Sequence, residues 1–199
     1  NTIFGFSHTH FSGTGHSDLG DFLVMPTTGK LTLEPGDAAK PRSGYHSQFL
    51  HENESAEPGY YSVLLDDYNI RAELTATEMV GFHQYTFPKT DSAHIILDLV
   101  SNIYPYDEKN VWTFVRLEND TTVTGFRTTT GWARTRTLYF VMKFSKPFVS
   151  YGHKKYDNTP YKGFYRRFNE SVNFPEMAGR RIRAYFNFKA GDNEKIRVK

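Results

Sequence analysis

AHIILDLV, residues 93–100, is the stretch that decides the fold class of this sequence. Its apolar side chains occupy both odd and even positions, so both faces of a strand formed by these residues are apolar. Such a run is typical of a central strand that is covered on both sides. The sequence therefore predicts a sheet whose middle strand is buried.

Most of the chain on either side of this run follows the two-residue period of half-buried strands. The alternation is clean in residues 70–79, 138–144 and 181–188, and less clean in residues 111–118. The apolar faces are Ile70, Ala72, Leu74 and Ala76; Val111, Thr113, Val115 and Leu117; Leu138, Phe140, Met142 and Phe144; and Ile182, Ala184, Phe186 and Phe188. No segment shows a sustained helical stripe, and turn-forming residues separate the strands. This pattern predicts an all-β fold, an antiparallel β-sandwich, with residues 1–199 as a single domain.

Composition excludes several classes of protein. An aromatic fraction of 16% in 199 residues is too rich in large packing groups for a disordered chain. The net charge of +2, with acids and bases mixed along the chain, gives no argument for nucleic-acid binding. The absence of cysteine excludes disulfides and thiolate chemistry. No stretch approaches the ~20 apolar residues of a membrane-spanning helix.

The two ends of the sequence predict a larger protein. The chain starts with Asn1 directly on a strand-like run and shows no signal peptide, which indicates a processed protein or an excised fragment. It stops at EKIRVK, residues 194–199, which has the pattern of a strand. Because a strand cut there would leave backbone donors and acceptors unpaired, we expect further polypeptide on both sides.

The polar segment HTHFSGTGHSD, residues 8–18, is the main functional candidate. His8 and His10 lie two residues apart on a predicted strand, so both imidazoles point to one face. Such a pair can hold zinc or iron when a third ligand arrives from elsewhere, and His16 and Asp18 are candidates for it. The alternative is that these side chains hydrogen-bond a neighbouring loop or bind a ligand directly. Two histidines alone are weak evidence for a metal, which favours the alternative.

Ser12, Gly13, Thr14 and Gly15 form a small-residue loop whose backbone N–H groups can approach a ligand closely. No Gly-Lys-Ser/Thr follows, as a phosphate loop requires, and the Gly-x-Ser-x-Gly order of a nucleophile elbow is absent there. We therefore interpret the stretch as a tight loop at the end of a sheet that also contacts a ligand.

Other polar stretches favour structural interpretations. Glu52, Glu54 and Glu57 offer carboxylates near aromatic residues, and an inverting glycosidase holds its acid and base roughly 6.5–9.5 Å apart. Three acids in one polar loop are nevertheless more typical of a solvated turn. Residues 131–137 and 180–189 mix basic and aromatic side chains, as some nucleic-acid surfaces do. Their alternation instead predicts arginines on solvated strand faces.

Three long blocks resemble glycoside hydrolase family 92, the bacterial calcium-dependent α-mannosidases. They are GFSHTHFSGTGHSDLGDFLVMP (residues 5–26), HENESAEPGYYSVLLDDYNIRAELTATEMVGFHQYTFP (residues 51–88) and GWARTRTLYFVMKFSKPF (residues 131–148). They occur in the family's order and span nearly the whole chain. The resemblance implies that residues 1–199 are most of an N-terminal β-sandwich domain, a supersandwich of the galactose-mutarotase-like type. It also implies that the family's first segment and its C-terminal (α/α)6 barrel lie outside this sequence.

The resemblance further implies exo-acting, inverting hydrolysis of α-mannosides, with α-1,2 linkages as the expected substrate. The family's active site lies in the cleft between the sandwich and the barrel, and its general acid, general base and most calcium ligands belong to the barrel. No catalytic or metal-binding residue is therefore carried over to this chain, which we expect to be inactive alone. The expected cofactor of the full-length enzyme is calcium.

By the same resemblance, this chain contributes a pocket wall and an interface with the barrel. The residues assigned to substrate binding are His8, His10, Ser12, Gly13, Thr14, Gly15, His16 and Asp18. The expected partners are mannose-containing glycans and the chain's own barrel domain, with no nucleic acid and no membrane span. The expected location is periplasmic, secreted or at the cell surface.

Two other functions remain as alternatives. A non-catalytic carbohydrate-binding sandwich would use exposed aromatic residues such as Trp112, Trp132 and Tyr156 to stack on sugar rings. A metal enzyme would use His8 and His10. The absence of a credible acid/base pair, together with the three blocks, favours a domain of a larger mannosidase.

Overall fold

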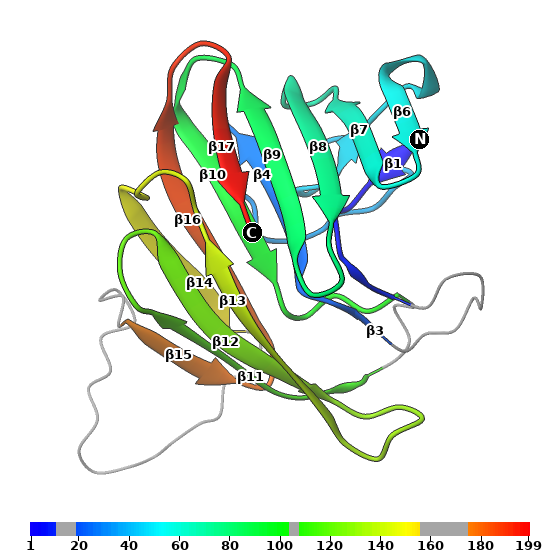
Figure 1. Ribbon diagram of the computed structural model, residues 1–199, viewed down its shortest axis with the longest axis vertical. Coiled ribbons are helices and arrows are strands. Elements are labelled where there is room, and N and C mark those ends of the chain that lie inside the picture. Colours follow the sequence, from blue (N-terminus) through cyan, green and yellow to red (C-terminus); the bar gives the residue numbers. More distant parts are fainter. Residues whose placement is uncertain (11–18, 104–107, 156–174) are drawn as a thin grey trace.

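The computed structural model describes residues 1–10, 19–103, 108–155 and 175–199 (Figure 1). Within these ranges the chain is built from β-strands, and its helical content is one 3-10 turn, η1 (His51–Asn53). No helix in the described part is long and apolar enough to cross a membrane. The prediction of an all-β chain is confirmed.

The strands are numbered β1 to β17 in chain order. They are β1 (Thr2–Ile3), β2 (Thr9–His10), β3 (Leu19–Asp21), β4 (Leu23–Thr28), β5 (Ser47–Gln48), β6 (Glu54–Glu57), β7 (Tyr60–Leu65), β8 (Ile70–Ala76), β9 (Gly81–Phe87), β10 (Thr90–Asp98), β11 (Asn110–Leu117), β12 (Thr122–Thr129), β13 (Arg136–Lys143), β14 (Ser150–Lys155), β15 (Glu176–Gly179), β16 (Ile182–Ala190) and β17 (Glu194–Val198).

These strands form three principal sheets and two short ribbons, and each pairing is antiparallel. The sheets have the strand orders β14-β16-β10-β4, β13-β12-β11-β15 and β17-β9-β8-β7-β6. The ribbons are β1-β5 and β2-β3. Figure 1 shows the sheet of β10 behind the sheet of β9 and β17. The predicted antiparallel sandwich is therefore confirmed.

Strand β10 is the buried middle strand that the sequence predicts. It lies between β16 and β4, and Ile95, Ile96 and Leu97 are all 0% exposed. Because consecutive residues of a strand point to opposite faces, burial of all three shows that both faces are covered. The apolar run thus buries the side chains that hold the layers together.

A single core joins the sheets. Phe144, just after β13, places its ring centroid 5.1 Å from that of Phe186 and 5.4 Å from that of Phe188, both on β16. Phe144 also forms an antiparallel bridge with Val198 of β17. The core therefore contains residues of all three principal sheets, as one domain requires.

Strand β17 connects two of these sheets. From Glu194 to Val198 it pairs with β9. Beyond Val198 it meets the end of β13, where Lys143 N donates to Lys199 O at 2.7 Å and Lys199 N donates to Lys143 O at 3.0 Å. The five-stranded sheet and the sheet of β13 are therefore linked through backbone hydrogen bonds at the end of β17.

The predicted alternation holds in most strands and fails at the end of one strand and at a bulge in another. In β8, Ile70 and Leu74 are buried as predicted, whereas Ala76 at the strand end is exposed. In β11, Val111 is 42% exposed although the alternation places it on the apolar face. A register shift in the pairing of β11 with β12, between Asn110 and Trp112, explains this error, because the extra residue of a bulge is displaced from its face.

The prediction that the arginines of residues 180–189 are solvated is wrong for Arg183. Its side chain is 7% exposed, and its Nε donates to Asp98 Oδ2 at 2.7 Å. Arg183 and Asp98 are direct cross-strand partners of β16 and β10. Asp98 Oδ2 also accepts the Tyr45 hydroxyl at 2.6 Å, and Asp98 Oδ1 accepts the backbone N–H groups of Val100 and Ser101 at 2.6 and 3.0 Å. Burial of this ion pair is compensated because the carboxylate has four donors.

Candidate functional site

The predicted substrate-binding segment begins at the end of the sandwich near β2 and β3. His8 lies just before β2 and is exposed, and His10 closes β2. The other assigned residues, Ser12, Gly13, Thr14, Gly15, His16 and Asp18, lie outside the described residues, as does the side chain of His10. Among the assigned residues, His8 is therefore the one whose contacts define a site.

His8 is joined to the core through a second histidine. His8 Nε2 lies 2.7 Å from His83 Nε2, and His83 Nδ1 lies 2.5 Å from the Tyr85 hydroxyl. His83 and Tyr85 are inward-facing residues of β9, at 4% and 0% exposure. A Cβ atom on Gly81 would collide with the His8 imidazole, so glycine at this position lets the ring lie against β9. The side chains of His8, His83 and Tyr85 thus form a series of contacts from the surface to the core.

The protonation of this pair follows from burial. Burial, together with the positive charge that His8 can carry, lowers the pKa of His83 to about 3. His83 is therefore neutral at ordinary pH, and two facing Nε2 atoms share one proton. When His8 supplies that proton, His83 accepts it in a hydrogen bond and its Nδ1–H donates to the Tyr85 oxygen. The hydrogen bond orients the His8 ring at the surface.

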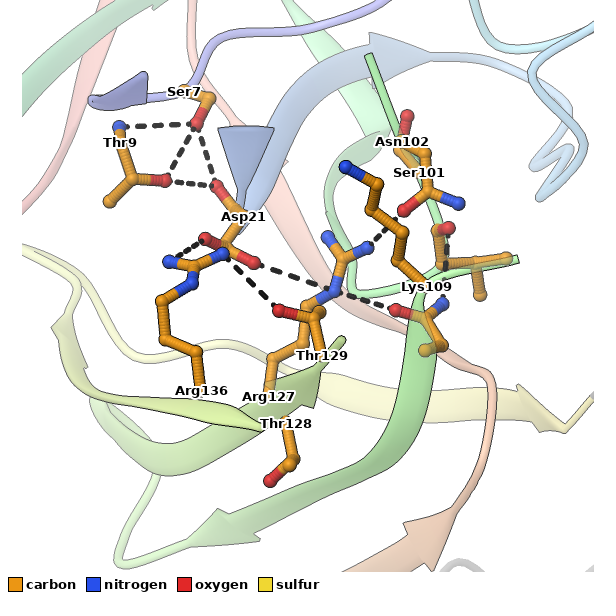
Figure 2. Close-up of polar contacts among 12 residues, drawn as sticks. Ser7, Thr9, Asp21, Ser101, Asn102, Lys109, Arg127, Thr128, Thr129 and Arg136 are labelled. Atoms are coloured by element: carbon orange, nitrogen blue, oxygen red, sulfur yellow. Dashed lines mark hydrogen bonds and ion pairs between the residues drawn. The ribbon is translucent and has the colours of Figure 1, made fainter. Parts of the chain in front are cut away.

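Asp21 holds the residues on either side of His8 in place (Figure 2). Its backbone carbonyl accepts the Ser7 hydroxyl at 2.6 Å and the Thr9 hydroxyl at 3.1 Å. Its buried carboxylate faces two guanidinium groups, with Oδ2 3.0 Å from Arg136 Nη1 and Oδ1 3.6 Å from Arg127 Nε. Asp21 thus ties the residues on the amino-terminal side of residues 11–18 to strands β12 and β13.

Arg127 is the buried cation of this network. Its Nε donates to Asn110 Oδ1 at 2.7 Å and its Nη2 donates to Asn102 Oδ1 at 2.6 Å. Burial lowers the pKa of its guanidinium, whereas the negative charge of Asp21 opposes that effect. Nη1 finds no hydrogen-bond acceptor among the described residues, although Arg127 is only 2% exposed. Among the described residues, Arg127 therefore keeps one unused donor, Nη1, while the negative charges of Asp21 and Asp98 both favour its charged form.

Two hollows meet at His8. The first, of about 550 Å³, lies between the residues that precede β2 and the strands β6 to β8, and Ser7, Glu57 and Tyr60 line it. The second, of about 640 Å³, lies between β13 and the turn that joins β8 to β9. Polar and aromatic side chains around the first hollow can form hydrogen bonds and stacking contacts of the kind that sugars make. This region is the candidate functional site.

The described residues do not assemble a metal centre. No group of three or more His, Asp or Glu side chains among them is placed to hold an ion. The Nε2 atom of His8 lies against His83, and the Asp21 carboxylate is neutralised by Arg127 and Arg136. Calcium requires six to eight oxygen ligands, and the described residues do not fit that requirement.

Of the other sequence candidates, Glu57 lines the first hollow. Glu54 is held by the Tyr61 hydroxyl at 2.6 Å and by His51 Nδ1 at 2.7 Å, and these hydrogen bonds lower its pKa. That pairing supports a structural role for Glu54, whereas the prediction of a solvated turn is wrong, because Glu54–Glu57 forms strand β6 and Glu52 lies in η1. Trp112 and Trp132 are 46% and 75% exposed, and Tyr156 lies outside the described residues.

Sequence reasoning missed His83, Asp21 and Arg127 as members of the site. A signal for two of them was present. His83 shares its strand parity with Tyr85 and Phe87, and Arg127 shares its parity with Val123, so each was a polar residue at an apolar position. Such a position requires a buried partner, which is where networks form.

Solved structures similar to this chain are glycosidases. The chain is 35% identical to the family GH92 alpha-mannosidase of Bacteroides thetaiotaomicron solved in complex with mannoimidazole, with a TM-score of 0.86. That match covers 99% of this chain and 25% of the solved one. A family GH92 inverting mannosidase from the same organism has 22% identity and a TM-score of 0.66 over 89% of this chain and 21% of its own, and supports the fold alone.

Sequence comparisons agree. An uncharacterized secreted glycosidase of Arthroderma benhamiae is 30% identical over 94 residues, which are 45% of this chain and 12% of that protein. The chain thus spans about a quarter or less of the length of the proteins it matches. The sequence profile of the glycosyl hydrolase family 92 N-terminal domain matches residues 1–199 in full. The chain therefore belongs to glycosyl hydrolase family 92, of which it is the N-terminal domain.

Proposed function

We propose that this chain is the N-terminal domain of a longer, exported, exo-acting α-mannosidase that cleaves α-1,2-linked mannose with inversion and depends on calcium. The observation that carries the proposal is the match of the whole chain to the family, together with 35% identity to a mannosidase solved with mannoimidazole. The secreted glycosidase among its relatives supports export.

In this proposal the catalytic acid, the catalytic base and the calcium ligands lie on the remainder of the protein, in a C-terminal helical barrel. Inverting hydrolysis needs two carboxyl groups about 6.5–9.5 Å apart, one to protonate the leaving oxygen and one to activate water. In the described part, the buried carboxylates Asp21 and Asp98 are each engaged by arginine. Neither is available for that chemistry, which supports a non-catalytic role for this domain.

The role that we assign to the domain is one wall of the sugar-binding cleft. His8 is an exposed group that lines the first hollow, and its ring is oriented by a buried neutral histidine. An imidazole held in this way can exchange hydrogen bonds with a sugar hydroxyl without first losing rotamer freedom. The segment of residues 10–18 continues from it along the chain.

Kinetics of the full-length protein test this role. Full-length protein is expected to hydrolyse an α-1,2-mannobiose to the β-anomer of mannose, observed by NMR immediately after cleavage, and to lose turnover with a calcium chelator. The 199-residue chain alone is expected to show none. In the full-length protein, His8→Ala should raise KM roughly tenfold, the scale of one lost hydrogen bond. The matched control is His51→Ala, which removes another exposed imidazole and should leave KM unchanged.

Three results would reject the proposal. They are turnover by the 199-residue chain, release of the α-anomer by the full-length protein, or no α-mannosidase activity in the full-length protein with calcium present. An unchanged KM in His8→Ala with activity intact would reject only the assignment of the cleft wall.

The second candidate function is a carbohydrate-binding module, favoured by the exposure of Trp112 and Trp132. Such rings bind the apolar face of a sugar. Calorimetric titration of the full-length protein and its Trp132→Ala variant with mannan separates the two functions. Mannan binding that is lost in the variant while hydrolysis of mannobiose persists would support a binding role for this surface.

A further inference from the structure

The outer edge of strand β13 is unpaired over most of its length. In an antiparallel strand, the backbone N–H and C=O groups of alternate residues point to opposite sides. The backbone N–H and C=O groups of Lys143 point away from β12, because they form hydrogen bonds with Lys199. Those of Val141, Tyr139 and Thr137 therefore point to the same side. No strand in the described part of the chain pairs with that side, since β13 is the first strand of its sheet.

This unpaired side, which we call the β13 edge, is also apolar. Residues 138–142 read LYFVM, with no proline and no charge. Tyr139 and Val141 are 75% and 59% exposed. Natural proteins protect edge strands with charges, proline, bulges or a covering segment, because a bare apolar edge pairs with other chains. The first three protections are absent from residues 138–142, which leaves a covering segment.

The hollow of about 640 Å³ lies along the β13 edge. One wall is formed by residues 138–142, and the opposite wall by the turn between β8 and β9, where Met79 and Val80 are 88% and 43% exposed. Val198 and Lys199 line its end. Figure 1 shows the end of β17 entering the space between β9 and β13. The hollow therefore lies between strand β13 and the β8–β9 turn and starts where the hydrogen bonds of β17 with β13 end, at Lys199.

We propose that residues following Lys199 in the full-length protein continue β17 as a longer strand, which fills this hollow and pairs with the β13 edge. The proposal rests on the proposed function in one respect, that the chain is part of a longer protein. The family assignment to an N-terminal domain, and solved relatives of which this chain covers 25%, support further polypeptide beyond it.

The existing ladder sets the register of this strand. Lys199 is opposite Lys143, so the second residue after Lys199 lies opposite Val141 and the fourth lies opposite Tyr139. Val198 is buried and Lys199 is exposed. The first and third residues after Lys199 therefore share the inward face of Val198, opposite Met142 and Phe140, and are expected to be apolar.

A continued β17 fits the hollow better than a second copy of the domain does. Its strand is already hydrogen-bonded at one end, so pairing proceeds residue by residue without closure of a new loop. A strand from another molecule would have to enter between β13 and the β8–β9 turn and would lose its translational and rotational entropy on association. The occupant to which the geometry points is therefore the chain's own continuation.

Hydrogen–deuterium exchange and cysteine cross-linking in the full-length protein test the proposal. Peptides covering residues 137–143 are expected to exchange slowly throughout, whereas a bare edge would let about half of their amides exchange fast. In the cross-linking arm, Val141→Cys is combined with a cysteine at the second position after Lys199, and mild oxidation should link them. The 199 residues contain no native cysteine that competes.

The matched control replaces Val111, another exposed valine, with cysteine and keeps the same second cysteine. Val111 lies on β11, three strand spacings or about 14 Å from the proposed strand, beyond the ~7 Å limit for a disulfide. Slow exchange with a link at Val141 and none at Val111 is the expected result. Fast exchange of residues 137–143, slow exchange without the link, or protection that depends on protein concentration would each overturn the proposal.

Mannosidase activity of the same full-length sample separates the two proposals. An active enzyme with a bare β13 edge overturns the strand and leaves the proposed function. An inactive protein with the link and slow exchange supports the strand and counts against the proposed function.

Discussion

Replacing His83 with glutamine should remove much of the acid sensitivity of this domain. The folded-state pKa of His83 is about 3, below the ordinary value of 6.5, because burial disfavours its charged form. Between these two values the unfolded chain takes up a proton at His83 and the folded chain does not. The stability contributed by neutral His83 is therefore fully present above about pH 6.5 and is lost as the pH falls below it.

The size of the effect follows from the pKa of the unfolded state. A pH of about 5 is ~1.5 units below the ordinary pKa of the imidazole. Protonation of His83 in the unfolded chain therefore lowers the free energy of unfolding by roughly 2 kcal/mol. Any folded-state pKa below about 4 gives the same loss at that pH, because the folded histidine is then still neutral. The prediction therefore depends on the direction and cause of the shift more than on its extent.

The assay is urea-induced unfolding followed by circular dichroism at about pH 7.5 and about pH 5. The wild-type chain should lose roughly 2 kcal/mol more between the two conditions than His83→Gln does. His51→Gln is the matched control, because it removes an exposed histidine and leaves His83 in place, so the loss attributed to His83 should persist. Equal losses in wild type and His83→Gln, or an NMR titration of the His83 ring near its ordinary pKa, would refute the reasoning.

Two further substitutions test the buried polar networks by the same unfolding assay. Asp21→Asn should lower the free energy of unfolding by about 3–5 kcal/mol, because it leaves the buried Arg127 cation without its counter-charge; a loss below about 1 kcal/mol would contradict this. Tyr45→Phe deletes the hydroxyl that donates to Asp98 at 2.6 Å and should cost about 1–3 kcal/mol, measured at neutral pH; no loss would show that the carboxylate does not need this donor.

Much of the fold could be predicted because, in a sandwich, the sequence of a few neighbouring residues indicates which face of a strand is buried. The run of residues 93–100 and the alternations in β8 and β16 each report a face within a few residues. The bulge beside Val111 could not be read in this way, because it depends on how β11 pairs with β12. The two-residue alternation therefore predicts which face a residue occupies only up to a bulge, where an extra residue shifts the alternation.

The site was predicted less completely because its partners are distant in sequence. Arg136 and Asp21 of the site are 115 residues apart, and Arg183 and Asp98 of the buried ion pair elsewhere in the sandwich are 85 apart. An arginine at an outward position of an alternating strand has the pattern of a solvated residue unless its carboxylate partner is known. His8 was found because the segment around it is dense in polar groups, whereas its partner His83 lies on another strand and was not.

The carboxylate that closes β10 has a consequence for how this sandwich assembles. Asp98 and Arg183 face each other only in the native alignment of β10 and β16. A slip of β16 by one residue would turn Arg183 to the opposite face of the sheet and leave the buried Asp98 carboxylate without its cation. The rest of this central strand is apolar and could pair in several registers with similar burial. The ion pair thus disfavours misfolded forms in which the strand is paired out of register.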